Sequence, residues 1–182
     1  MMQYGAKLLV ILSMIMGSFF LGSTYYWYSP RYPSVTKAIA IIHPTKGNTT
    51  FGSVTFLEER NGLRVKAILK GLTPGMHGFH IHELGDCSCP DATCTQGHFN
   101  PTQQQHGGPE SSERHVGDMG NVTADKEGNA HYEYIDHYMK LNGPLSIVGR
   151  SVIVHSDADD FVSQPTGNAG SRIGCGVIGI AR

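Results

Sequence analysis

The sequence lacks an excess of charge of either sign. It contains 14 lysine and arginine residues against 15 aspartate and glutamate residues, so its formal net charge is −1. We therefore expect no nucleic-acid partner, because binding to phosphates requires a strongly basic surface. The chain of 182 residues is long enough for one domain with a full core and too short for two ordinary domains.

Charged residues are also scarce at the N-terminus, where Lys7 is the only one before Arg31. The run 8–21 is apolar apart from three small residues, and an aromatic cluster follows at 25–28. Two interpretations remain open: a cleaved signal peptide, or a signal anchor that spans the membrane with residues 8–28. The aromatic cluster lies where an interfacial belt would lie and favours the anchor.

We therefore assign residues 1–30 to a signal peptide or signal-anchor segment and residues 31–182 to the folded domain. Both interpretations place this domain outside the cytosol, membrane-anchored or secreted. Disulfides persist in such a compartment. The four cysteines are Cys87, Cys89, Cys94 and Cys175. Four cysteines allow three full pairings, and the first three are also close enough in sequence for a thiolate metal site.

Helical patterns are missing from the rest of the chain, whereas glycine is abundant with 23 residues. β-Branched residues cluster in short runs that are separated by turn residues, which favours strands over helices. The expected strands are 36–42, 53–58, 63–69, 78–83, 120–124, 130–135, 151–155 and 174–180. Eight short strands predict an all-β antiparallel sandwich or barrel.

The segment 84–118 has neither a strand pattern nor a helix pattern. A stretch of this length without regular structure is usually functional or disordered. It contains His98, His106, His115 and Asp118. These residue types bind metal, and a bound metal ion would order the segment.

Two histidines on one expected strand, His80 and His82, are separated by a single apolar residue. Side chains alternate between the two faces of a strand, so both imidazoles leave the same face. Phe79 and Ile81 then point into the core. Alone this pattern is weak, because it also suits two polar residues on a solvated strand face.

Further residues make a metal centre the better interpretation. Imidazole suits copper and zinc, and a carboxylate suits zinc. The candidate ligands are His80, His82, His98, His106, His115, Asp118 and His155. Seven ligands are too many for one four-coordinate ion, but they fit two ions if one imidazole bridges them.

Six motifs in the same order resemble the copper/zinc superoxide dismutases of eukaryotic type. They are HGFHIHE at 77–83, HFNP at 98–101, HGGP at 106–109, ERHVGDMGNVTADKEGNA at 113–130, VIVHSDADD at 152–160 and TGNAGSRIGCGVIGIA at 166–181. The resemblance extends from about Val35 to the C-terminus. It implies an eight-stranded Greek-key β-sandwich or barrel with long metal-binding loops. It also implies superoxide dismutation by copper redox cycling, with zinc in a structural role.

The resemblance assigns roles to individual residues, with one copper and one zinc per subunit. Copper would be bound by His80, His82, His98 and His155, and zinc by His98, His106, His115 and Asp118. His98 would bridge the metals and take part in catalysis. Asp159 would orient one histidine of each site, and Arg172 would attract the superoxide anion.

Two departures from the family pattern stand out. Cys175 resembles one half of the family's disulfide, but no cysteine falls at the expected place for the other half. Cys94 is the preferred partner because Cys94-Thr95 keeps a local match before HFNP, and Cys89 and Cys87 stay open as alternatives. The remaining two cysteines would stay free, bind metal or pair between chains. In addition, the stretch from Asp159 to Arg172, which includes 161–165, is several residues shorter than is usual in the family and lacks the expected charged residues.

The resemblance also implies partners: superoxide as substrate, a second copy of the chain, and a copper chaperone for loading. The dimer contact would involve residues 176–181 and 147–149. Two other functions are a copper-delivery or copper-storage protein and a metal-free binding sandwich. The presence of all seven ligands argues against both, and a Met-x-Cys-x-x-Cys delivery domain is absent from the sequence.

Overall fold

Eight strands make up nearly all the regular structure in the computed structural model, which describes residues 34–182. They are β1 (Lys37–Pro44), β2 (Phe51–Glu59), β3 (Gly62–Lys70), β4 (Gly75–His82), β5 (Asp118–Ala124), β6 (Ala130–Asp136), β7 (Ser151–His155) and β8 (Arg172–Ile180). Each expected strand is present, with ends that differ by no more than three residues. The assignment of 1–30 to a signal or anchor segment lies outside the described residues. Within 34–182, no helix is long and apolar enough to cross a membrane.

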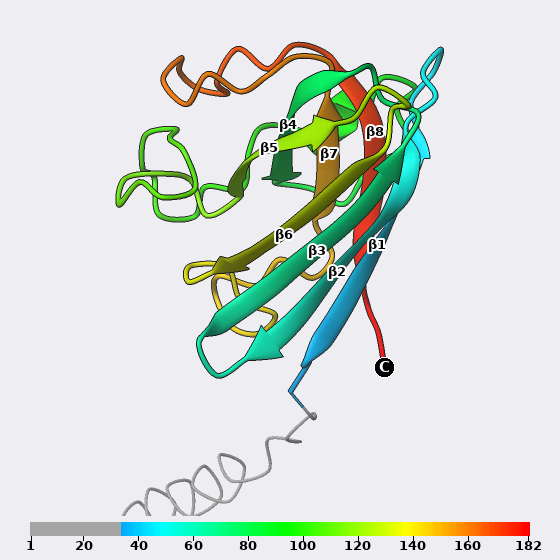
Figure 1. Ribbon diagram of the computed structural model, residues 1–182. Helices are drawn as coiled ribbons and strands as arrows, with labels where there is room; N and C mark the ends of the chain where they lie inside the picture. Colours follow the sequence, from blue (N-terminus) through cyan, green and yellow to red (C-terminus); the bar gives the residue numbers. More distant parts are fainter. Residues whose placement is uncertain (1–33) are drawn as a thin grey trace, which may run out of the picture. The chain divides into compact units, whose positions relative to one another are not determined.

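The strands form a closed antiparallel barrel in the order β1-β2-β3-β6-β5-β4-β7-β8 (Figure 1). β3 pairs with β6 and β4 pairs with β7, so the chain crosses over twice, as in a Greek key. The side chains of each strand alternate between the interior and the outer face of the barrel. In β3, for example, the residues between the buried ones face outward, and the buried ones are Leu63, Val65, Ala67 and Leu69. The predicted fold class is confirmed.

The part of β4 from residue 77 to 82 is buried, where the strand pairs with β5 on one side and β7 on the other. Phe79 and Ile81 are completely buried in the main core. His80 and His82 are also buried, on the other face of the strand. The expected separation of two apolar residues from two histidines is therefore present on one rigid strand.

The segment between β4 and β5 contains only a short 3-10 helix, η1 (Thr93–Thr95). Its later part runs back along β4 through backbone hydrogen bonds. Phe99 N donates to Ile81 O at 2.8 Å, and Ile81 N donates to Gly117 O at 2.9 Å. These hydrogen bonds give an isolated backbone β-bridge between His82 and His98. The loop therefore brings a third imidazole beside the two on the strand.

Buried Arg114 fixes the end of this loop. Its guanidinium pairs with the buried carboxylate of Asp136 at the end of β6. It also donates to the carbonyls of His115 and Asp118, both at 3.0 Å. An arginine with five donors suits such a role, because it can satisfy several loop carbonyls at once.

The expected disulfide between Cys94 and Cys175 is wrong. The structure pairs Cys87 with Cys175, with a Cα–Cα distance of 5.9 Å, and Cys89 with Cys94, at 5.6 Å. Cys87 packs against Cys175 and Ile153, because the loop passes over β7 and β8 as it leaves β4. The feature that favoured Cys94 was its neighbour Thr95, which is buried near His82. None of the four cysteines is free.

Candidate metal centre

All seven residues predicted as ligands gather into two adjacent sets. Within each set, one ligand atom per residue lies within 4.8 Å of the others, and every member is buried. The first set is His80, His82, His98 and His155, and the second is His98, His106, His115 and Asp118. His98 belongs to both.

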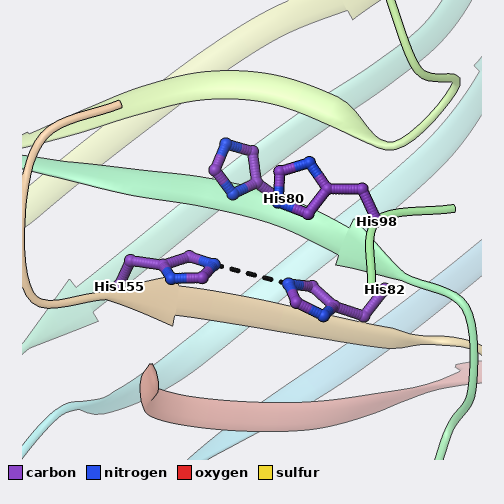
Figure 2. Close-up of side chains that lie close together, drawn as sticks. All are labelled: His80, His82, His98 and His155. Carbon is purple, nitrogen blue, oxygen red and sulfur yellow. Dashed lines mark hydrogen bonds between the residues drawn. The ribbon is translucent and has the colours of Figure 1, made fainter. Parts of the chain in front are cut away.

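The first set joins two strand ends to the loop (Figure 2). The Nε2 atoms of His82 and His155 lie 3.4 Å apart. The Nδ1 atom of each ring faces a backbone carbonyl, that of Gln96 at 2.6 Å for His82 and that of Gly170 at 3.3 Å for His155. With Nδ1–H as the donor, both Nε2 lone pairs are available to one ion.

Both imidazoles are held in the neutral form that metal binding requires. Burial is the main reason why the pKa of His82 lies well below its ordinary value, and the nearby His98, His155 and Arg172 further disfavour a positive charge on this ring. Burial also holds the pKa of His155 well below its ordinary value, with a further contribution from His80. A neutral histidine keeps a lone pair for a metal ion.

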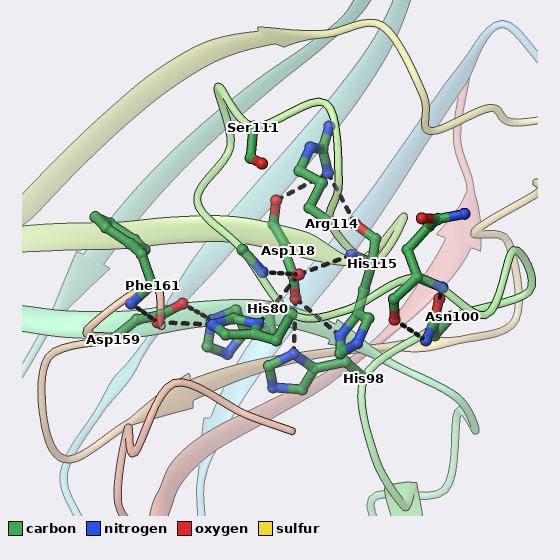
Figure 3. Close-up of polar contacts among 12 residues, drawn as sticks. His80, His98, Asn100, Ser111, Arg114, His115, Asp118, Asp159 and Phe161 are labelled. Carbon is green, nitrogen blue, oxygen red and sulfur yellow. Dashed lines mark hydrogen bonds and ion pairs between the residues drawn. The ribbon is translucent and has the colours of Figure 1, made fainter. Parts of the chain in front are cut away.

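The carboxylate of Asp118 is the centre of the second set (Figure 3). Its oxygens lie 2.7 Å from His98 Nδ1, 3.1 Å from His106 Nδ1 and 3.3 Å from His115 Nδ1. The backbone N–H of His115 also donates to it, at 2.8 Å. Burial alone would raise the pKa of Asp118, but the contacts with the three histidines outweigh burial and hold it well below its usual range.

Unpartnered nitrogens test whether the two sets fit metal ions. The Nδ1 atom of His80 and the Nε2 atom of His98 are buried and have no hydrogen-bond partner. The Nδ1 atoms of His106 and His115 are buried as well and make no hydrogen bond, although the Asp118 carboxylate lies near both. Buried polar atoms without partners are rare and costly, and a metal ion would satisfy them. Four imidazoles suit copper, and three imidazoles with a carboxylate suit zinc. Both sets therefore fit these ions.

Asp159 connects the two sets. Its carboxylate lies 2.7 Å from His80 Nε2 and 2.9 Å from His106 Nε2, so it fixes one ring of each set. Burial would lower the pKa of His106, but Asp118 and Asp159 outweigh burial and raise it to about 9. Gly167 is required beside this carboxylate, because a Cβ atom there would collide with Asp159 and the φ angle is +66°.

Arg172 lies at the rim of the first set. Its Nη1 donates to Ala92 O at 2.5 Å, and its Nη2 donates to Gln96 O at 2.7 Å. Gln96 O is also the carbonyl that faces His82 Nδ1, so one atom joins the arginine to the first set. The guanidinium is held by carbonyls and not by a carboxylate, which leaves its charge available to an anion.

A cavity of about 450 Å³ opens beside Arg172 and is also lined by Lys46 and Asp91. Lys46 lies in the turn after β1, and its backbone N–H donates to Pro90 O at 2.7 Å. We did not identify Lys46 from the sequence, because it is far from every motif. It is a second cation at this cavity, whereas Asp91 adds a negative charge.

Gln164 was also missed. Its Oε1 accepts from His106 N at 2.8 Å, and its Nε2 donates to His106 O at 3.0 Å. The two hydrogen bonds attach the short stretch 161–165 to the backbone of a residue in the second set. The sequence drew attention to this stretch only through its short length and its lack of charge, and neither property predicts a role for an amide side chain.

Two adjacent ion sites that share an imidazole, on the outer face of a Greek-key barrel, define a binuclear metalloprotein. Residues 50–178 match the family model described as copper/zinc superoxide dismutase (SODC). The chain therefore belongs to the copper/zinc superoxide dismutase family, a family of oxidoreductases with copper and zinc as cofactors.

Curated relatives and a solved structure agree with this family. The extracellular superoxide dismutase [Cu-Zn] of Brugia pahangi is 42% identical over 161 residues, which cover 81% of this chain and 79% of the relative. The superoxide dismutase [Cu-Zn] of Paramecium bursaria Chlorella virus 1 is 45% identical over 156 residues and 82% of each chain. The crystal structure of the clock protein EA4 is similar, with a TM-score of 0.77 and 39% identity over 85% of this chain and 100% of that one.

Removal of metal should loosen the loop 84–117 before it loosens β4. The β4 amides are held by ladders to β5 and β7, whereas most of the loop lies outside the sheet and depends more on its metal ligands for order. Hydrogen exchange on protein treated with a chelator should show early loss of protection at 84–117 and later loss at 75–82. Zinc added alone should restore the loop's protection. Equal loosening of both segments would contradict this prediction.

Proposed function

We propose that this chain converts superoxide to oxygen and hydrogen peroxide, with copper in the first set of ligands and zinc in the second. One observation carries the residue assignment. His98 is shared by both sets, is buried, and leaves Nε2 without a partner while Nδ1 contacts Asp118. A ring with one nitrogen directed to each set is suited to bridge two ions.

Copper, when bound, supplies one-electron redox cycling between two superoxide molecules, whereas zinc has no redox chemistry. The protein's own residues supply charge, orientation and a proton site. Arg172 provides fixed positive charge beside the first set, which attracts a small anion. His98 Nε2 is placed to hold a proton and pass it to the reduced product. Asp159 keeps His80 in the tautomer whose Nδ1 faces the first set.

Activity should follow copper content. Protein loaded with both metals should dismutate superoxide in a direct decay assay, and protein that holds zinc alone should be inactive. Metal analysis of each sample provides the reference. A fully loaded sample without activity would contradict the proposal and would favour copper delivery or storage. A loaded sample that is active would exclude the metal-free binding role.

Arg172→Gln should lower kcat/KM by about tenfold at low salt, because one charge that attracts the substrate is lost. The rate should also depend less on ionic strength than that of the unaltered protein, since salt screens this attraction. Arg60→Gln is the matched control, because Arg60 is exposed in the turn between β2 and β3. Equal rates for both variants would exclude a steering role for Arg172.

We also propose that the chain forms a homodimer through the outer face of β1 and β8. Ile41, Val177 and Ile180 are 50%, 45% and 67% exposed, and a cavity of about 530 Å³ lies on this face. Exposed apolar clusters of this kind are typical of protein interfaces. From the expected second contact segment, Gly149 is exposed but Ile147 is buried in the core and is not available.

Sedimentation should therefore give the mass of two chains for the purified protein. Val177→Glu should shift the equilibrium to the monomer, because a charge would be buried in the contact. Ile68→Lys on β3 is the control. The side chain of Ile68 is exposed to a similar extent, 51%, but it lies on β3 and not on the proposed β1 and β8 contact face. A monomer before any substitution would refute the proposed dimer.

The location outside the cytosol also remains a proposal, with residues 1–30 as a signal peptide or anchor and 31–182 as the domain. It is supported by two disulfides that include all four cysteines, and by the extracellular relative from Brugia pahangi. N-terminal sequencing of the mature protein distinguishes cleavage from anchoring through residues 8–28. Copper would then be supplied by a chaperone or by direct uptake in that compartment.

A further inference from the structure

The second disulfide has no part in the metal sets or in the long-range link to β8. It joins Cys89 to Cys94, only 5 residues apart in sequence. The two cysteines close a short ring that also contains Pro90, Asp91, Ala92 and Thr93. This ring forms one wall of the cavity beside Arg172, through Asp91 and Thr93.

Ala92 is the central residue of the ring. It is completely buried, and its φ angle of +57° places it in the left-handed region, which residues with a side chain rarely adopt. Its N–H donates to Cys89 O at 2.9 Å across the ring. The unfavourable backbone conformation persists because the surrounding chain holds it.

This conformation directs the carbonyl of Ala92 at Arg172. The oxygen accepts hydrogen bonds from Arg172 Nη1 at 2.5 Å and from Thr95 Oγ1 at 2.8 Å. Thr95 Oγ1 also accepts from Arg172 Nη1 at 3.1 Å. One acceptor of the guanidinium therefore belongs to the turn that the Cys89–Cys94 bond encloses, and the other two, on Thr95 and Gln96, follow this turn directly.

The ring is attached to its surroundings on the other side as well. The turn after β1 binds it through the hydrogen bond from Lys46 N to Pro90 O. Thr45 Oγ1 donates to Arg172 O at 2.7 Å, which fixes the backbone of the arginine to the same turn. The backbone of Arg172 is thus fixed by β8 and by Thr45. Its guanidinium is held by Ala92 O inside the ring and by Thr95 Oγ1 and Gln96 O directly after it.

We propose that the Cys89–Cys94 disulfide is a positioning element for Arg172, because it holds the Ala92 carbonyl where the guanidinium must bind to face an incoming anion. Both cysteines act through Ala92 and do not touch substrate. A covalent ring restricts the turn more than hydrogen bonds alone would. This inference rests on the proposed function, in which Arg172 attracts superoxide.

A double-mutant cycle tests the proposal on the full chain loaded with copper and zinc. Cys89→Ser with Cys94→Ser is combined with Arg172→Gln, and the affinity for azide, a monovalent anion, is measured from copper absorption. The paired cysteine substitutions should weaken azide binding and lower kcat/KM by roughly three- to tenfold when Arg172 is present, as expected for a misplaced charged contact. They should have almost no effect in the Arg172→Gln background.

Three results would overturn the proposal. One is an equal loss in both backgrounds, which would show that the ring only stabilises the fold. Another is no loss when Arg172 is present. The third is a peptide map of the unaltered protein without a Cys89–Cys94 link. Ser88→Ala, an exposed position just outside the ring, is the matched control and should leave azide binding unchanged.

Two further measurements keep the test decisive. If the paired cysteine variant does not fold, the native protein is treated with a water-soluble phosphine, which reduces the Cys89–Cys94 bond to two thiols and becomes the phosphine oxide. Cys175 is only 4% exposed, so its bond should resist, and mass mapping verifies this selectivity. Because azide binding does not require turnover, a protein inactive towards superoxide would refute the proposed function but still report the position of Arg172.

Discussion

The carboxylate of Asp159 is the interaction on which the rest of the centre depends. It is nearly inaccessible to water and contacts His80 of one set and His106 of the other. Burying a carboxylate is costly unless donors surround it, and the two rings and the Phe161 N–H provide them. Burial would raise the pKa of Asp159, but these hydrogen bonds hold it well below its usual range. Any change in one ring is therefore transmitted to the other through a shared acceptor.

The centre combines parts of different rigidity. His80, His82 and His155 come from strands, whose positions are fixed by the barrel's ladders. His98, His106 and His115 come from the loop, which is fastened by Arg114, by a disulfide across 88 residues and by the amide of Gln164. The strand residues give the site its shape before metal is present. The fastened loop then completes it at a smaller entropic cost than a free loop.

The sequence was sufficient for the strands and for the gathering of ligands, because both follow side-chain patterns. Alternation placed His80 and His82 on one face, and the resemblance brought the loop histidines to them. The pairing of Cys175 could not be deduced, since three cysteines lie within eight residues and the choice depends on the path of the loop over β7. The role of Ala92 could not be predicted from the sequence either, because it acts through its backbone carbonyl, a group that every residue has. Lys46 and Gln164 act at positions outside the motifs.

The direction of β1 separates both ends of the described domain from the substrate cavity. The strand begins at Lys37, close to the chain's end, where Lys37 Nζ donates to Arg182 O at 2.8 Å. It ends at Pro44, beside the turn that contacts Arg172, after about 23 Å of extended chain. The first residues of β1 and the last residue of the chain thus lie together at the end of the barrel that is far from the cavity beside Arg172. Neither end of the described domain therefore restricts the access of a diffusing anion to this cavity.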